Sequence, residues 1–181
     1  MTDEAPLILT LRFDDESFER FQKLRQKHFP PSRNLIPAHL TLFHHLPGHE
    51  LEMVTGHLEK TVAEWGPIKC RVSGLRFLGK GVAYEVDSPP AERLRADLAG
   101  HFYDHLTAQD RQRINPHVTI QNKAEASVAR KLYEELESAF EPFSFEATGL
   151  LLWSYRGGPW EAAGEFQFCR KSPDVDQKLD A

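Results

Sequence analysis

The stretches HLTLF at residues 39–43 and HVTIQ at residues 117–121 decide the fold of this chain. Each stretch begins with a histidine, places a threonine two positions later and has apolar residues at the positions after these two. Neighbouring side chains of a β-strand point to opposite faces, so each stretch is predicted to be a strand with one apolar and one polar face. Two copies of this pattern indicate a repeated structural unit.

The alternation of side chains predicts which residues of the two strands share a face. The first polar face is expected to carry His39, Thr41 and Phe43, and the second His117, Thr119 and Gln121. The apolar faces are expected to pack beneath helices, which leaves the polar faces to line a cleft between two lobes.

The residues around the two stretches predict the same order of elements in each half of the chain. The first half is expected to run as a strand at 7–13, a helix from Asp14, the His39 strand, a helix at 49–65, and strands at 68–78 and 81–87. The second half reuses 81–87, followed by a helix from Ser88, the His117 strand, a helix at 125–140, and strands at 143–155 and 160–168.

The predicted fold is therefore α+β, a bilobal pseudo-twofold duplication of about residues 7–87 and 81–168. Each lobe is expected to have a mainly antiparallel sheet with two helices on its outer face, and the central cleft to carry both histidine-threonine motifs. Residues 1–170 form a single domain in this prediction, and the polar residues 171–181 form a disordered tail.

Composition limits the possible partners. The chain has 181 residues, 40% of them hydrophobic, and a net charge of −5, which argues against an extended nucleic-acid surface but leaves room for one small anion. No apolar run is long enough to span a bilayer, and no signal peptide is evident at the N-terminus, so we expect a cytoplasmic protein without membrane contact. Cys70 and Cys169 are expected to be reduced thiols, and we expect a monomer.

The residue types in the motifs suit phosphodiester chemistry. One neutral and one protonated imidazole can coexist near neutral pH, so His39 and His117 can act as a general base and a general acid. The hydroxyls of Thr41 and Thr119 can donate hydrogen bonds to non-bridging phosphate oxygens, where negative charge develops. This chemistry requires no cofactor and no metal.

The contexts IPAHLTLFHHLPG and INPHVTIQNK, together with the duplicated order of elements, resemble the two-histidine (2H) phosphoesterase superfamily, in particular its 2′-5′ RNA ligase-like, cyclic phosphodiesterase branch. The resemblance implies hydrolysis of 2′,3′-cyclic phosphodiesters of nucleotides or short RNA ends, with possible ligase-type activity. It also implies that His117 is the base and His39 the acid, and that Thr41 and Thr119 bind the phosphate.

Further candidates for substrate binding lie around the motifs. Arg33 and Arg113 each precede a motif histidine and either clamp a phosphate or lie on the surface. Tyr84 and Tyr155 lie on strands that border the cleft and either stack on a base or pack in the core. Phe43 and Gln121 are included because each is predicted to share the face of a motif histidine.

Two alternative functions remain open. The first is a nucleotide-binding module that has the same cleft but no turnover. The second is metal-dependent hydrolysis through His44, His45 and His49, although strand alternation sends His44 to the face opposite His39 and no established ligand spacing is present. We predict no metal site.

Overall fold

The computed structural model describes residues 5–170, so the predicted tail at 171–181 lies outside the described residues. The first half of the chain forms β1 (Leu7–Phe13), α1 (Asp15–His28), β2 (Thr41–Leu46), α2 (Leu51–Glu64), β3 (Ile68–Phe77) and β4 (Val82–Asp87). The second half adds α3 (Pro89–Phe102), β5 (His117–Gln121), α4 (Ala126–Ser138), β6 (Phe143–Ser154) and β7 (Glu161–Gln167). The predicted order of helices and strands is confirmed.

All seven of these strands belong to one antiparallel sheet, which confirms the α+β class. The strand order is β2-β1-β6-β3-β4-β5, and β7 pairs with the part of β6 that extends beyond β3. Exchanging β1, β2 and β3 for β4, β5 and β6 gives the same strand order, now read from the opposite edge of the sheet. The third strand of each half pairs with the first strand of the other half, so the two lobes are interleaved.

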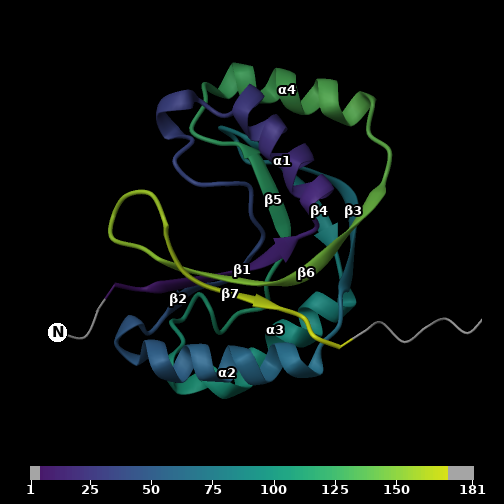
Figure 1. Ribbon diagram of the computed structural model, residues 1–181. Helices are drawn as coiled ribbons and strands as arrows, with labels where there is room; N and C mark the ends of the chain where they lie inside the picture. Colours follow the sequence, from purple (N-terminus) through teal and green to yellow (C-terminus); the bar gives the residue numbers. More distant parts are fainter. Residues whose placement is uncertain (1–4, 171–181) are drawn as a thin grey trace, which may run out of the picture.

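Each lobe is covered by two helices, one from each half of the sequence (Figure 1). α1 and α4 lie together over β3, β4 and β5, while α2 and α3 lie together on the opposite side of the molecule. None of these helices, within the part of the chain that the structure describes, is long and apolar enough to cross a membrane.

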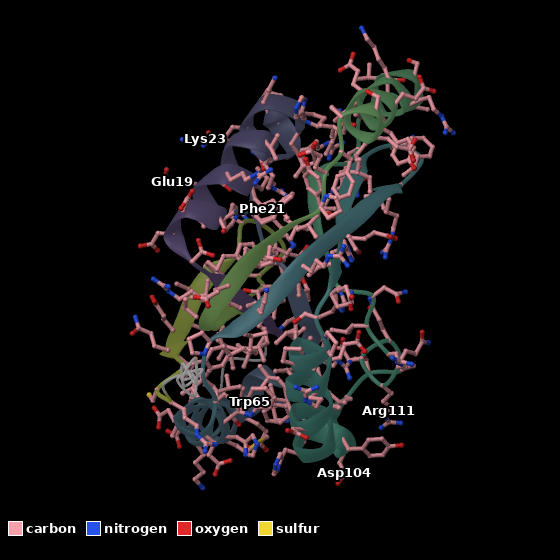
Figure 2. All side chains as sticks on the ribbon, turned by 90° about the vertical axis from the view of Figure 1, so that its right-hand side faces the viewer. Glu19, Phe21, Lys23, Trp65, Asp104 and Arg111 are labelled. Atoms are coloured by element: carbon pink, nitrogen blue, oxygen red, sulfur yellow. The ribbon has the colours of Figure 1, made fainter. Side chains whose placement is uncertain are left out.

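The sequence of α1 explains where the helix starts and which face it buries. Asp14 is the N-cap, because its Oδ1 accepts a hydrogen bond of 2.9 Å from the backbone N–H of Ser17. Phe21 is fully buried among aromatic rings, whereas Glu19 and Lys23 form an exposed ion pair one turn apart. Figure 2 shows Phe21 directed into the molecule and the two charged residues directed away from it.

The strand that carries the first motif departs from the prediction. β2 begins at Thr41, so His39 lies in the loop just before the strand. The pairing of β1 with β2 shifts register twice, and the neighbouring residues Leu42 and Phe43 are both fully buried. The register shifts place Phe43 in the core and His44 in the pocket that His39 lines, so the faces predicted for this strand are correct only at its start.

Two expectations are therefore wrong. Phe43 does not share the face of His39; its ring packs in the core, 6.2 Å from that of Phe102 and 4.4 Å from the guanidinium of Arg95. His44 does not lie on the face opposite His39, because the irregular register turns it into the same pocket.

Candidate active site

The two motifs meet at one cavity of about 410 Å³, which we call the motif pocket. It is lined by His39 from the loop before β2, by Thr41 at the start of β2, and by His117 and Thr119 of β5. Its other lining residues are mostly polar: His44, Arg76, Gln109, Asp110, Gln112, Arg113, Ile114, Asn115 and Trp160. The topology therefore brings together the four residues that the motif pattern selects.

Both motif histidines are held by the same hydrogen bond. Nδ1 of His39 lies 2.8 Å from the carbonyl oxygen of Pro37, and Nδ1 of His117 lies 2.8 Å from that of Asn115. A carbonyl only accepts hydrogen bonds, so each Nδ1 carries a proton and donates it. Each neutral ring then has its lone pair on Nε2, the nitrogen that a substrate can use.

Burial favours the neutral form of both rings. Desolvation lowers the pKa of His39 to about 4, helped by the positive charges of Arg25, His117 and His44, while the Pro37 hydrogen bond acts in the opposite sense. Desolvation also lowers the pKa of His117, against the effect of the Asn115 hydrogen bond. A bound anion would favour the protonated form of either ring.

A buried arginine from α1 holds the second motif. The side chain of Arg25 is only 2% exposed; its Nη1 donates a 2.8 Å hydrogen bond to the carbonyl of Thr119, and its Nε donates one of 3.1 Å to Oδ1 of Asn34. Burial lowers the pKa of this guanidinium to about 10, so it remains charged at neutral pH. Arg25 thus links the strand of His117 to the loop that leads to His39.

A second buried arginine, from α3, makes the reciprocal connection. Nε of Arg95 donates a 3.3 Å hydrogen bond to the carbonyl of Leu42, and its Nη2 donates to the carbonyl of Asp110. Arg95 thus links the strand after His39 to the loop that leads to His117. Each half of the chain supplies an arginine that fixes the motif strand of the other half.

The structure places a third imidazole in the motif pocket. Asp110 is 1% exposed, and its carboxylate accepts hydrogen bonds from the backbone N–H groups of His44 and His45 and from Nδ1 of His44 at 3.1 Å. Desolvation opposes ionisation of Asp110, but these hydrogen bonds prevail and lower its pKa. The contact directs Nε2 of His44 away from Asp110, and the positive charge of His44 helps to lower the pKa of both His39 and His117.

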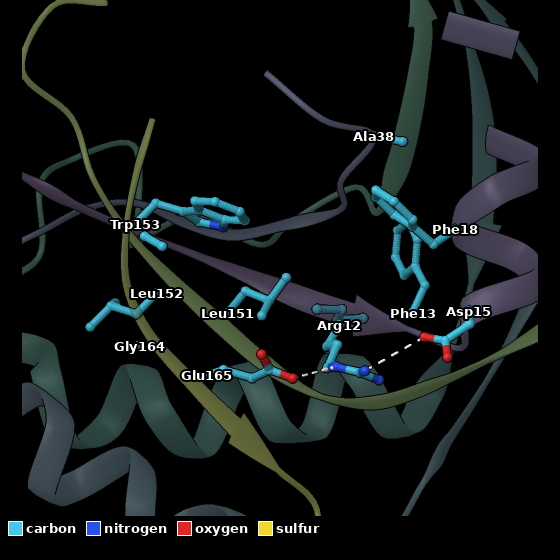
Figure 3. Close-up of a pocket in the computed structure, with 12 residues that line it drawn as sticks. Arg12, Phe13, Asp15, Phe18, Ala38, Leu151, Leu152, Trp153, Gly164 and Glu165 are labelled. Atoms are coloured by element: carbon cyan, nitrogen blue, oxygen red, sulfur yellow. Dashed lines mark hydrogen bonds and ion pairs between the residues drawn. The ribbon is translucent and has the colours of Figure 1, made fainter. Parts of the chain in front are cut away.

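An aromatic residue borders His39. The ring of Trp160, in the loop between β6 and β7, lies 4.6 Å from the ring of His39 and 6.0 Å from that of Trp153. Trp153 belongs to an adjoining hollow of about 450 Å³ on β1, β6 and β7 (Figure 3). Ala38 lines this hollow and its neighbour His39 lines the motif pocket, so the two cavities adjoin.

The other predicted substrate-binding residues are scattered. Arg113 lines the motif pocket and pairs with Glu92 at 3.0 Å. Arg33 is exposed in a short 3₁₀ turn away from the pocket lining, and Tyr155 is 42% exposed beyond the end of β6. Gln121 is buried, with Nε2 donating to the carbonyl of His28, and Tyr84 packs against core aromatic rings. The structure does not bring Arg33, Tyr155, Gln121 or Tyr84 into the pocket.

No metal-binding cluster is formed by the residues that the structure describes: nowhere among them do three histidine, cysteine or acidic side chains gather in a suitable arrangement. Cys70 is buried and Cys169 exposed, both as free thiols.

The two histidine-threonine motifs line one pocket of this antiparallel sheet, which is the arrangement expected of a two-histidine phosphoesterase. The model of the 2′-5′ RNA ligase superfamily matches residues 13–159, and the chain belongs to this superfamily. No curated protein is significantly similar in sequence.

Solved structures share the fold at low sequence identity. TT0787 of Thermus thermophilus is 16% identical, with a TM-score of 0.62 over 90% of this chain and 97% of that protein. LigT of E. coli in complex with 3′-AMP is 18% identical, with a TM-score of 0.61 over 93% of this chain and 100% of LigT. At such identities the likeness establishes the fold.

Several pocket residues escape inference from the sequence. His44 enters the motif pocket only because β2 shifts register, and Asp110 lies in a polar loop without periodicity. Trp160 follows a turn and reaches His39 only through tertiary packing. One feature of the sequence could have identified the buried arginines: Arg25 and Arg95 each lie on the helix that precedes a motif.

Proposed function

We propose that this chain hydrolyses 2′,3′-cyclic phosphodiesters of nucleotides or RNA ends by metal-independent acid–base catalysis. The observation that carries the proposal is the matched anchoring of His39 and His117. Both rings donate from Nδ1 to a carbonyl two residues earlier, and both line one pocket. Two imidazoles with the same tautomer can serve as a base and an acid on either side of one phosphorus atom.

The proposed step is attack of water on phosphorus. One Nε2 removes a proton from the water as its oxygen bonds to phosphorus, and the bond to the ribose 2′ or 3′ oxygen breaks. The other Nε2, protonated beforehand, gives its proton to the leaving ribose oxygen, so charge and protons balance. Hydrogen bonds from Thr41 and Thr119 would stabilise the non-bridging oxygens in the transition state.

The nucleoside is proposed to occupy the adjoining hollow. Figure 3 shows Phe13 and Phe18 on one side of it and Trp153 on the other, an arrangement suited to a planar base. At its polar end Arg12 pairs with Glu165 at 2.7 Å and with Asp15 at 3.5 Å. Because two carboxylates surround one guanidinium, this end of the hollow disfavours a phosphate and can accept a hydrogen bond from the amino group of a base. LigT, solved with 3′-AMP, ATP and NADP⁺, supports a nucleotide substrate.

A panel of 2′,3′-cyclic nucleotides with phosphorus NMR detection tests the proposal and identifies the product isomer. His39→Ala and His117→Ala are each expected to lower kcat about 10²–10⁴-fold, and EDTA is expected to have no effect. Undiminished turnover by the double variant would refute the mechanism. Tight nucleotide binding by calorimetry without any hydrolysis would favour the binding module. If EDTA abolishes activity and added zinc restores it, the metal-dependent alternative is favoured.

A leaving-group substitution assigns the two histidines. The family resemblance makes His117 the base and His39 the acid, which requires bound phosphate to raise the pKa of His39 well above about 4. A nucleoside 3′-(p-nitrophenyl phosphate) releases an anion that needs no protonation. The ribose 2′-OH is the nucleophile in this ester, so the histidine that protonates the 2′ oxygen during hydrolysis acts here as the base. The ester should therefore restore activity to the variant that lacks the hydrolytic base and leave the variant that lacks the hydrolytic acid inactive; if the NMR product is a 2′-phosphate, the 2′ ester takes its place.

A further inference from the structure

A third cavity, of about 530 Å³, lies between α3 and the loop that leads to β5. Gln112, Arg113 and Ile114 line both this cavity and the motif pocket. Both spaces therefore border this loop segment, and a ligand that occupies both of them has to pass it.

The third cavity is strongly basic. Arg93, Arg95, Arg111 and Arg113 line it, and Glu92 supplies its one lining carboxylate. The surplus of positive charge is unusual in a protein whose net charge is −5. Electrostatic complementarity therefore selects an anionic group at this place.

The four arginines differ in what already engages them. Arg113 pairs with Glu92 at 3.0 Å, and the guanidinium of Arg95 is committed to backbone carbonyls. The exposed Arg111 makes only a long contact of 3.5 Å with the carbonyl of Tyr103 and lies over its ring, and Figure 2 shows it on the flank of the molecule beside α3.

Arg93 is the least engaged of the four. Its side chain is exposed on α3, and it forms no hydrogen bond or ion pair with any other residue that the structure describes. Arg93 and Arg111 are thus available to an incoming ligand.

We infer that this cavity, which we call the arginine subsite, binds a second phosphate group of the same substrate. The inference rests on the proposed function, because the first phosphate is the one placed between His39 and His117. Guanidinium groups bind phosphate through paired, charge-assisted hydrogen bonds, and several can share one phosphate. The substrate class is then a cyclic phosphate that carries a further phosphate, either at the ribose 5′ position or in the preceding link of an RNA chain.

Three substrates separate these possibilities. Adenosine 2′,3′-cyclic phosphate has one phosphate, its 5′-phosphorylated form has a second on the same ribose, and adenylyl-adenosine 2′,3′-cyclic phosphate has a second in the preceding link. The wild-type protein is expected to show kcat/KM about tenfold higher for at least one of the two longer substrates. Whichever substrate shows the gain identifies the source of the second phosphate.

The variant Arg93→Gln/Arg111→Gln should abolish this gain and leave turnover of adenosine 2′,3′-cyclic phosphate unchanged, because neither residue lines the motif pocket. The exposed Arg71, on β3, provides the matched control, and Arg71→Gln should keep the gain. The gain should also fall as salt is raised in the wild type, whereas the double variant should show similar kcat/KM for all three substrates at every salt concentration.

Equal kcat/KM for all three substrates in the wild type would overturn the inference, and so would a gain that persists in the double variant. If none of the substrates is hydrolysed, the proposed function fails, and calorimetry with 3′-AMP and adenosine 3′,5′-bisphosphate decides the subsite separately. Tighter binding of the bisphosphate, lost in the double variant, would support the subsite; equal binding of both ligands would overturn it.

Discussion

At the scale of single residues, the motif pocket is governed by the group to which each imidazole donates. His39 and His117 donate to backbone carbonyls, whereas His44 donates to a buried carboxylate. A carbonyl fixes the tautomer without supplying a full charge, whereas a carboxylate fixes the ring and also carries a full negative charge. The hydrogen-bond partner therefore distinguishes His39 and His117 from His44.

The lowered pKa of His39 predicts sensitivity to acid. Its value falls from the ordinary 6.5 to about 4 in the folded chain, so the unfolded state takes up a proton first as the pH decreases. The contribution of His39 to stability is complete above about pH 6.5 and is lost progressively between 6.5 and about 4. Thermal unfolding from pH 7 to pH 4 should show a smaller loss of Tm in His39→Gln than in the wild type. Parallel losses in the two proteins would contradict this assignment.

Asp110 predicts a coupled loss of stability and substrate affinity. Asp110→Asn replaces an acceptor of three N–H groups with a side chain that has only one acceptor oxygen. Unfolding in urea should show a loss of about 2 kcal/mol, since hydrogen bonds to charged groups are worth roughly 1.5–3 kcal/mol. KM for a cyclic nucleotide should rise because His44 loses its orientation. In contrast, Asp104→Asn, an exposed change in the 3₁₀ turn at 103–105, should alter neither quantity.

At the scale of elements, β2 shows where inference from sequence succeeds and where it stops. The positions of His39 and Thr41 at the pocket are predictable because the apolar residues around them report local burial. Those of Phe43 and His44 are not, because two register shifts against β1 depend on a neighbouring strand. The periodicity of a segment does not reveal a register shift. A pocket residue that follows such a shift therefore cannot be identified from its own segment.

The two buried arginines predict that the helices before the motifs stabilise them from outside. Arg25→Met removes hydrogen bonds to Thr119 and Asn34 and leaves a buried carbonyl without its donor. The cost should be about 2–3 kcal/mol in the free energy of unfolding. Hydrogen exchange should quicken most in β5, far in sequence from the substitution. The exposed Arg93→Met on α3 is the control, and equal exchange in both variants would refute a specific link.

At the scale of the whole molecule, the interleaved lobes make the two halves depend on each other. β1 pairs with β6 across its length, and α1 packs on β5. The elements of each half are predictable from their own residues, whereas the exchange of third strands is not, because strand order is decided by pairing between distant segments. The motif pocket also depends on both halves, because His39 comes from the first half and His117 from the second.

Separate halves are therefore expected to be unstable. Cutting the chain in the turn between β3 and β4 gives fragments 1–79 and 80–181, and each loses strand partners from the other. Neither fragment alone should unfold cooperatively in a thermal melt, while an equimolar mixture should recover a single transition. A cooperative transition in one isolated fragment would show that its lobe is self-sufficient.

The strand order that survives exchange of the halves has a consequence for ancestry. Two copies of a chain half as long, each lending its last strand to the other, would assemble the same sheet as a symmetric homodimer with one cleft on the axis. Its two histidines would be chemically identical, so neither could be specialised as the acid or as the base. Fusion into one polypeptide removes that obligation, and only afterwards can mutation adjust one imidazole without adjusting the other.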